Sequence, residues 1–246
     1  MKYKAFHKLS YGLYVIATGK DGEKFGYIGN TAFQVTSEPA QIAVSSHKDN
    51  FTTGKILQNG NFTVSVLKKE ASTSLIGEFG FMSGSVYNKF RNVKTQTAVT
   101  GAPVVLDSAV AWFDCRVVNS IDVGSHILII GEVVGCDVIS DDEPLTYDYY
   151  REKYKMLAPR NAPTYIEKEK LENEIVPGRE TEPAVEKAAP NPESLSSYTC
   201  AICGFQYNPQ EGDPTMGISP GTPFEDLPDD YKCPICNAGK NYFRED

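Results

Sequence analysis

Several common signatures are missing from this chain of 246 residues. The longest apolar stretch, residues 127–134, is interrupted by Gly131 and Glu132 and is far too short to span a membrane. The first residues lack the apolar segment of a targeting peptide, so we expect a soluble, cytoplasmic protein. Lys and Arg number 24 against 32 Asp and Glu, a net charge of −8, which argues against binding nucleic acid or an anionic membrane.

Cysteine is also scarce, with six in the chain, but four of them form two Cys-x-x-Cys pairs near the C-terminus. The pairs are Cys200 with Cys203, and Cys233 with Cys236. Each pair brings two sulfurs onto one tight turn, and two such turns can close a tetrahedral site for zinc or iron. A disulfide framework fits less well because the chain shows no secretion signal. Spacing alone leaves a structural zinc ribbon and an iron centre open.

Aromatic residues around these cysteines favour iron, because they predict a larger apolar core than a zinc ribbon commonly carries. They are Tyr198, Phe205, Tyr207, Phe224, Tyr231 and Phe243. With the cysteines, they make residues 198–243 resemble rubredoxin, in which four thiolates hold one iron that carries single electrons. The resemblance implies iron on Cys200, Cys203, Cys233 and Cys236. The chain departs from the rubredoxin pattern at Asn237, where glycine is usual, and at Tyr231, where tryptophan is usual.

Composition divides the chain into three parts. Residues 167–197 are rich in Glu, Lys, Pro, Ala and Ser and contain few large apolar side chains, which indicates a flexible linker. We therefore predict a first domain over residues 1–166 and a small rubredoxin-like domain over residues 198–246. The small domain has eight acidic residues against three basic ones and should dock on a basic partner surface.

The first domain is predicted to be mainly β. Segments rich in Val, Ile, Tyr and Phe and bounded by turn residues predict strands over 11–18, 26–34, 41–46, 62–67, 110–118 and 126–138. Six strands in this length suggest a barrel. Two short helices are expected, one over 51–58 between an N-cap at Asn50 and Gly60, and one over 72–79.

Residues 45–52 run from a predicted strand directly to the start of a predicted helix. Backbone N–H groups, the positive end of the helix dipole, hydroxyl groups and Lys48 would meet there, as at many phosphate sites. On its own, the segment fits a well-capped loop without a ligand at least as well. A glycine-rich nucleotide fingerprint is absent, because residues 19–22 read as a hairpin turn.

Residues 26–52, 61–67, 125–133 and 159–165 together resemble the flavin reductase family of FMN-binding split barrels. The resemblance implies homodimers with FMN near the subunit interface. It also implies that the segment around the flavin ring and the loop around its phosphate bind the cofactor. These predicted residues are Asn30, Thr31, Ala32, Gln34, Ser45, Ser46, Lys48, Asn50 and Thr52, where Gln34 replaces a common serine.

His126 has two interpretations. A lone histidine at the start of a strand is more often a hydrogen-bonded structural residue. The resemblance instead places it near the flavin or the dimer interface, where it would orient the nicotinamide of NAD(P)H.

The order of the domains resembles the high-molecular-weight rubredoxins, which pass electrons from NAD(P)H to a flavodiiron nitric oxide or oxygen reductase. Flavin accepts two electrons as hydride and iron accepts one, so the fusion would convert between them. We expect no side chain to act as a general acid or base. Two alternatives stay open, a free-flavin reductase that serves a monooxygenase and a non-enzymatic flavin-binding barrel beside a structural zinc module.

Overall fold

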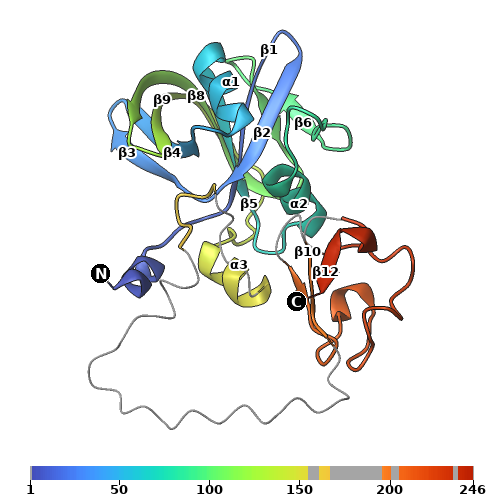
Figure 1. The fold of residues 1–246 in the computed structure, drawn as a ribbon. Helices are drawn as coiled ribbons and strands as arrows, with labels where there is room; N and C mark the ends of the chain where they lie inside the picture. Colours follow the sequence, from blue (N-terminus) through green and yellow to red (C-terminus); the bar gives the residue numbers. More distant parts are fainter. Residues whose placement is uncertain (1, 155–160, 167–195, 201–204, 235–237, 246) are drawn as a thin grey trace.

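The computed structural model describes residues 2–154, 161–166, 196–200, 205–234 and 238–245 (Figure 1). The fold is mainly β, as predicted, with a seven-stranded sheet in the first region and a separate three-stranded sheet near the C-terminus. Among the described helices, none is long and apolar enough to cross a membrane. The predicted linker falls almost wholly outside the described residues, so the bounds of the three predicted segments stay predictions.

The first region is a split barrel with short helices on its outside and at one end (Figure 1). Its strands are β1 (Tyr14–Lys20), β2 (Glu23–Gly29), β3 (Ala32–Ser37), β4 (Ala40–His47), β5 (Asn61–Leu67), β6 (Thr95–Thr97), β7 (Pro103–Val105), β8 (Ala109–Asp122) and β9 (His126–Val138). Its helices are η1 (Tyr3–Lys8), α1 (Phe51–Asn59), α2 (Thr73–Phe81) and α3 (Tyr147–Tyr154).

The main sheet is antiparallel and has the order β2-β1-β5-β8-β9-β4-β3. The strands β2 and β3 follow one another in the chain but lie at opposite edges of this sheet. The predicted single strand over residues 26–34 is therefore wrong, because it breaks at Asn30 and Thr31. Glycine and asparagine are poor strand formers, so the strand ends at this point, and the Asn30 side chain donates a hydrogen bond to Thr164. Asn30 and Thr31 thus mark a seam where the two sheet edges meet.

The predicted helix signals around α1 are confirmed. The Asn50 side chain accepts a hydrogen bond from the backbone N–H of Thr52, and Gly60 ends the helix with a φ of 69°. The helix α2 is also confirmed and begins after Ser72, whose hydroxyl caps Leu75 N–H. The helix α3 was not predicted, because its eight residues are too few and too polar to show a helical period.

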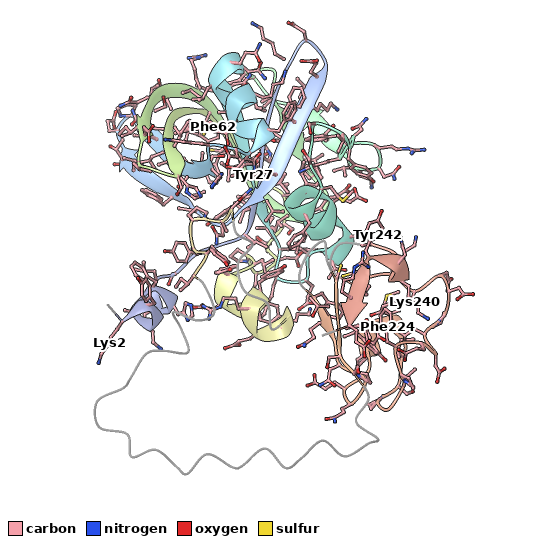
Figure 2. All side chains as sticks on the ribbon, in the orientation of Figure 1. Lys2, Tyr27, Phe62, Phe224, Lys240 and Tyr242 are labelled. Atoms are coloured by element: carbon pink, nitrogen blue, oxygen red, sulfur yellow. The ribbon has the colours of Figure 1, made fainter. Side chains whose placement is uncertain are left out.

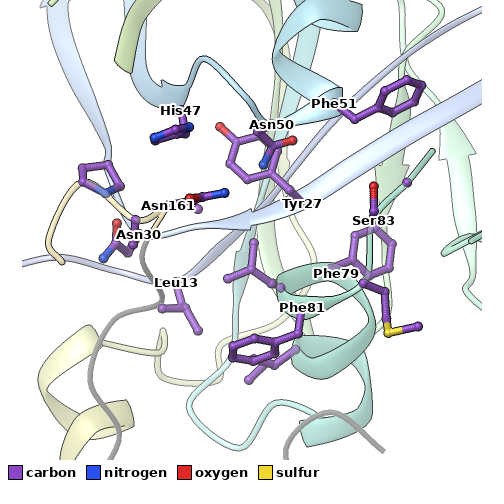
Figure 3. Close-up of a pocket in the computed structure, with 18 of the residues that line it drawn as sticks. Leu13, Tyr27, Asn30, His47, Asn50, Phe51, Phe79, Phe81, Ser83 and Asn161 are labelled. Carbon is purple, nitrogen blue, oxygen red and sulfur yellow. The ribbon is translucent and has the colours of Figure 1, made fainter. Parts of the chain in front are cut away.

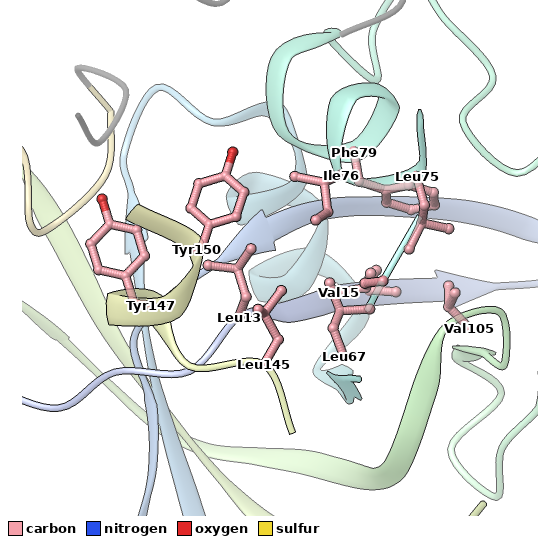
Figure 4. Close-up of a cluster of buried hydrophobic side chains, with 12 residues drawn as sticks. Leu13, Val15, Leu67, Leu75, Ile76, Phe79, Val105, Leu145, Tyr147 and Tyr150 are labelled. Atoms are coloured by element: carbon pink, nitrogen blue, oxygen red, sulfur yellow. The ribbon is translucent and has the colours of Figure 1, made fainter. Parts of the chain in front are cut away.

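Two clusters of buried side chains form the core of the first region. One lies inside the barrel around Ile16, Ile56 and Phe62. The other joins the barrel to α2 and α3 through Leu67, Phe79 and their neighbours (Figure 4). In this second cluster Tyr147 and Tyr150 of α3 pack on the end of the barrel, so α3 closes the same end that α2 covers.

The C-terminal module (residues 198–245) has its own sheet and core. It contains β10 (Tyr198–Cys200), β11 (Gln206–Tyr207), β12 (Phe243–Glu245) and the short helices η2 (Pro214–Met216) and η3 (Lys240–Tyr242). Its core is the predicted aromatic cluster, in which Phe224 (Figure 2) and Phe243 are buried together with Cys200 and Cys233. All six predicted aromatic residues belong to this cluster or pack against it.

Candidate flavin and iron sites

A cavity of about 390 Å³ lies at the seam between the two sheet edges (Figure 3). Its wall is built from the end of β2, the end of β4 with the start of α1, and the end of α2 with the loop that follows. Residues 161–163 and the α3 side chains Tyr147 and Tyr150 close the remaining side. The volume lies in the range of sites that bind small molecules and cofactors.

Three of the predicted flavin residues, Asn30, Ser45 and Asn50, line this cavity. Asn30 is buried and donates from Nδ2 to Thr164 Oγ1 at 2.6 Å, which ties the seam to residues 161–166. The backbone N–H of Ser45 donates to the Thr31 carbonyl at 3.2 Å and holds the second edge beside it. The chain therefore brings together residues that lie 15 to 20 positions apart, as the resemblance implies.

The other predicted residues lie behind or beside the cavity wall. Thr31 donates from its hydroxyl to Asn30 Oδ1 at 3.1 Å and supports the lining residue. Ser46 and Thr52 are buried, and Ser46 Oγ lies 2.5 Å from Thr53 Oγ1. Ala32 packs on the barrel core, whereas Gln34 is exposed on β3.

Lys48 is held by a neighbouring hairpin. Its Nζ lies 2.6 Å from Asp122 Oδ2, and its backbone N–H donates to the Ser125 carbonyl. Because this carboxylate already balances the ammonium charge, Lys48 would have to leave its partner to reach a phosphate. The flavin roles of all these residues stay predictions.

His126 stands one layer behind the cavity. Its ring packs edge-on against His47, a lining residue, with ring centroids 4.9 Å apart. Its Nε2 lies 3.3 Å from the Asn161 carbonyl, which accepts only, so Nε2 carries the proton and Nδ1 accepts from the Ser125 hydroxyl. Burial holds the pKa of His126 below its ordinary value. These contacts fit the structural interpretation, in which a neutral His126 fixes two wall residues.

Tyr27 is a lining residue that sequence reasoning missed. Its ring rises beside His47 and Asn50 in Figure 3. Burial raises the pKa of Tyr27 to about 12, an effect that the nearby Ser46 hydroxyl partly offsets. The phenol oxygen makes no hydrogen bond of ordinary geometry to any described residue. Leaving a buried hydroxyl without a partner costs about 1–3 kcal/mol, which an acceptor atom of a bound ligand would relieve.

Lys89 is the second lining residue that the sequence did not reveal. It is 5% exposed, and its Nζ donates to the backbone carbonyls of Gly26 at 3.0 Å and Phe79 at 2.9 Å. Burial lowers the pKa of Lys89 to about 8, and within the described residues no carboxylate pairs with it. A buried ammonium without a counter-charge favours an anionic ligand nearby.

The cavity therefore fits a flavin mononucleotide. The start of α1 with Asn50, the unpartnered phenol of Tyr27 and the ammonium of Lys89 supply donors for a phosphate and for the polar edge of the ring. A flavin in this site would accept hydride from a nicotinamide and pass the electrons on. The chain's own residues would bind the cofactor, orient it and exclude water.

The predicted iron site is described in part, since Cys203 and Cys236 lie outside the described residues. Cys200 and Cys233 are both buried in the aromatic cluster of the C-terminal module. Their surroundings match, because Cys200 N–H donates to the Phe205 carbonyl and Cys233 N–H donates to the Ala238 carbonyl, both at 2.8 Å. Two buried thiols in one cluster, each on a residue whose N–H donates to a carbonyl five positions further on, suit a four-thiolate metal site.

Tyr231 keeps the role of the tryptophan that rubredoxins usually have there. It is buried in the cluster, and its hydroxyl donates to Asp213 Oδ2 at 3.0 Å. Asp213 is itself 4% exposed and also accepts from Met216 N–H. The substitution is therefore accommodated by a buried acceptor for the phenol, which satisfies the polar atom that tyrosine introduces.

Comparison with known proteins identifies both regions. Residues 6–158 match the family model for the flavin reductase like domain, and residues 197–243 match the model for rubredoxin. A high molecular weight rubredoxin from Moorella thermoacetica is 41% identical over 246 residues, covering 100% of both chains.

Two further relatives match the first region. A ferric-chelate reductase (NAD(P)H) from Archaeoglobus fulgidus is 44% identical over 167 residues, which cover 68% of this chain and 99% of that protein. The solved structure of the flavin reductase PheA2 in its native state superposes with a TM-score of 0.50 at 29% identity. That superposition covers 58% of this chain and 88% of the other.

Proposed function

This chain belongs to the high-molecular-weight rubredoxins, and we propose that it passes electrons from NAD(P)H through FMN and a four-thiolate iron to a flavodiiron nitric oxide or oxygen reductase. The family matches make the chain an NAD(P)H-dependent oxidoreductase with a flavin domain and an iron domain. We propose in addition that the flavin is FMN, that the predicted residues of the cavity bind it and that the final acceptor is a flavodiiron protein.

One observation carries the proposal. The same chain holds a cofactor-sized cavity with a buried phenol that lacks a partner among the described residues and, in a separate aromatic module, two buried cysteines. NAD(P)H would deliver hydride, two electrons and a proton, to the flavin. The flavin would return the electrons one at a time to ferric iron and release its protons to solvent. Each ferrous iron would then be reoxidised by the one-electron acceptor.

The test is anaerobic stopped-flow reduction of the intact chain by NADH and by NADPH. Flavin absorbance and the iron–thiolate charge-transfer band are followed separately, after metal and flavin contents have been measured. We expect the flavin band to bleach first and the iron band to follow. Stoichiometric zinc in place of iron, in protein made with adequate iron, would overturn the electron-carrier role.

The acceptor is inferred from charge. Residues 198–246 carry eight acidic and three basic side chains, so the surface that meets a partner is acidic. Reduction of a purified flavodiiron protein should therefore slow as ionic strength rises, because salt screens the attraction of an acidic donor to a basic partner. Equal turnover by a chain whose iron is removed would exclude this acceptor route.

A second candidate is reduction of a small acceptor directly at the barrel. It is favoured by the relative whose printed activity is ferric-chelate reduction and which matches only the first region of this chain. A full-length Cys200→Ser, Cys233→Ser variant separates the two functions. Unchanged NAD(P)H oxidation with ferric chelate or free flavin supports the second candidate, whereas loss of protein-acceptor reduction supports the first.

We also propose that the chain forms a homodimer through the outer strands of the barrel. Apolar side chains on β3 and on the β8–β9 hairpin are exposed, including Phe33 at 50% and Val123 at 55%. A dimer would cover these apolar atoms. Light scattering should give about twice 27.1 kDa, and a Phe33→Asp, Val123→Asp variant should give a monomer.

A further inference from the structure

The side chain of Phe81 touches both functional regions. It is the last residue of α2, and it lines the cavity at the seam together with Met82 and Ser83 (Figure 3). The same side chain packs against the aromatic cluster of the C-terminal module. Phe81 is the only residue of the first region that joins that cluster among the described residues.

The end of α2 is held in place by buried side chains of the helix. Leu75, Ile76 and Phe79 anchor the helix in the core at the end of the barrel, so its last residue cannot swing freely (Figure 4). After Phe81 the chain leaves the helix at Met82 with φ −91° and ψ 144° and continues along the cavity wall. Phe81 is therefore presented at the edge of the cavity, and the module strands lie beside this end of α2 (Figure 1).

The module contributes the end that carries its cysteines. Phe205 and Ala238, two of the partly buried residues around the cluster, follow Cys203 and Cys236 by two positions in the sequence. Their carbonyls accept the hydrogen bonds from Cys200 and Cys233. The cluster against which Phe81 packs therefore includes Cys200 and Cys233.

We propose that Phe81 is the docking contact that holds the iron module at the mouth of the flavin cavity and sets the rate of electron transfer from flavin to iron. This inference rests on the proposed function for its electron donor, but the docking itself does not depend on bound flavin. A single aromatic anchor is enough for a tethered module, because the linker already keeps its effective concentration near millimolar order. A weak contact also leaves the module able to release and meet an external acceptor.

The contact is apolar. Every ion pair between two described residues lies within residues 47–153, so none of them joins the module to the barrel. Docking through Phe81 should therefore persist at high salt, in contrast to an encounter steered by charge. In each transfer, one electron leaves the reduced flavin and converts ferric iron to ferrous iron. Two transfers consume the two electrons of one hydride.

The test compares Phe81→Ala and Phe81→Leu with the native chain. Val86→Ala is the matched control, since Val86 lies five residues on in the same loop and is 86% exposed. All variants are saturated with FMN, loaded with iron and reduced by NAD(P)H in a stopped-flow cell. Because Phe81 also lines the flavin cavity, iron reduction is measured relative to flavin reduction in the same trace, and we expect this ratio to fall by about tenfold or more in Phe81→Ala, as on truncation of an aromatic hot spot. Phe81→Leu should be intermediate, and Val86→Ala should match the native chain.

Docking is measured independently by small-angle X-ray scattering and by hydrogen exchange of the oxidised full chains, with and without FMN. Phe81→Ala should increase the largest dimension and speed exchange in the module peptides, at both 50 mM and 500 mM salt. Native compactness and native iron-reduction rate in Phe81→Ala would overturn the proposal. So would release of the module by salt alone, or undocking that leaves the transfer rate unchanged. A chain that binds no flavin contradicts the proposed function instead, and scattering then still decides whether Phe81 docks the module.

Discussion

The barrel and the C-terminal module are stabilised in different ways. The barrel buries two clusters of mainly aliphatic side chains under a seven-stranded sheet. The module has a three-stranded sheet of very short strands and one small aromatic cluster around two cysteines. A core of that size supports little stability without a staple. The barrel should thus stay folded without its cofactor, whereas the module should depend on its metal.

The sharpest test of this comparison removes one thiol from the module. Cys233→Ser should abolish iron binding and unfold the module, because metal binding supplies much of its folding free energy. Calorimetry of the full chain should lose the module's transition and keep the barrel's. The matched control is Cys136→Ser, since Cys136 is an exposed cysteine on β9. If the module kept its own unfolding transition without metal, its stability would not depend on the metal, and the two regions would not differ in this respect.

The converse test weakens the barrel and leaves the module alone. Phe62 is fully buried, and a Cβ placed on Gly131 would lie 2.6 Å from its ring, so the packing around it is tight (Figure 2). Phe62→Ala should lower the free energy of unfolding of the barrel by about 3–5 kcal/mol. Val99→Ala, at an exposed position between β6 and β7, should change it by less than about 0.5 kcal/mol. The iron–thiolate spectrum should be native in both variants, and its loss would show that the regions fold as one unit.

A smaller effect is expected at Tyr27, whose buried hydroxyl without a partner lowers the stability of the ligand-free barrel. Tyr27→Phe removes the buried hydroxyl that lacks a partner, so the FMN-free barrel should be as stable as the native one or slightly more stable. The same change should weaken FMN binding by about 1 kcal/mol, roughly fivefold, if the hydroxyl donates to the cofactor. Titration calorimetry and thermal melts of one sample measure both. Unchanged affinity would show that the phenol does not face the flavin.

The smallest effect is a pH dependence of FMN binding. Since burial lowers the pKa of Lys89 to about 8, the ammonium loses its proton as the pH rises through 8. FMN is anionic and favours the protonated form, so its affinity should fall above pH 8 in the native chain and stay level in Lys89→Met. In the FMN-free barrel, the unfolded state holds the Lys89 proton more tightly, so stability should rise from pH 8 towards the ordinary lysine pKa. An affinity that falls equally in both chains would assign the titration to another group.

The sequence predicts most of what depends on local signals. The cap at Asn50 and the left-handed Gly60 placed α1 correctly, and the aromatic spacing of residues 198–243 predicted the core of the module. The resemblance also placed Asn30, Ser45 and Asn50 in positions that now line one cavity.

What the sequence could not supply depends on tertiary contacts. The break at Asn30 was not predicted, because Gly29 and Asn30 interrupt the run of strand-forming residues only briefly and the place of the break depends on which sheet edge each half joins. In the sequence, Tyr27 resembles an ordinary strand residue and Lys89 resembles a surface lysine. Only the structure shows that both are buried. Phe81 carries no motif at all. Its position between two regions follows only from the packing of α2.

The seam between β2 and β3 has a consequence for how the cavity wall is held. These neighbouring strands occupy opposite edges, so no ladder of hydrogen bonds runs between them in the described barrel. The wall at Asn30 is instead fixed by two other segments, through the bond from the Asn30 side chain to Thr164 and the bond from Ser45 N–H to the Thr31 carbonyl at the end of the β3–β4 ladder. The alignment of this wall thus depends on residues 161–166 as well as on the sheet.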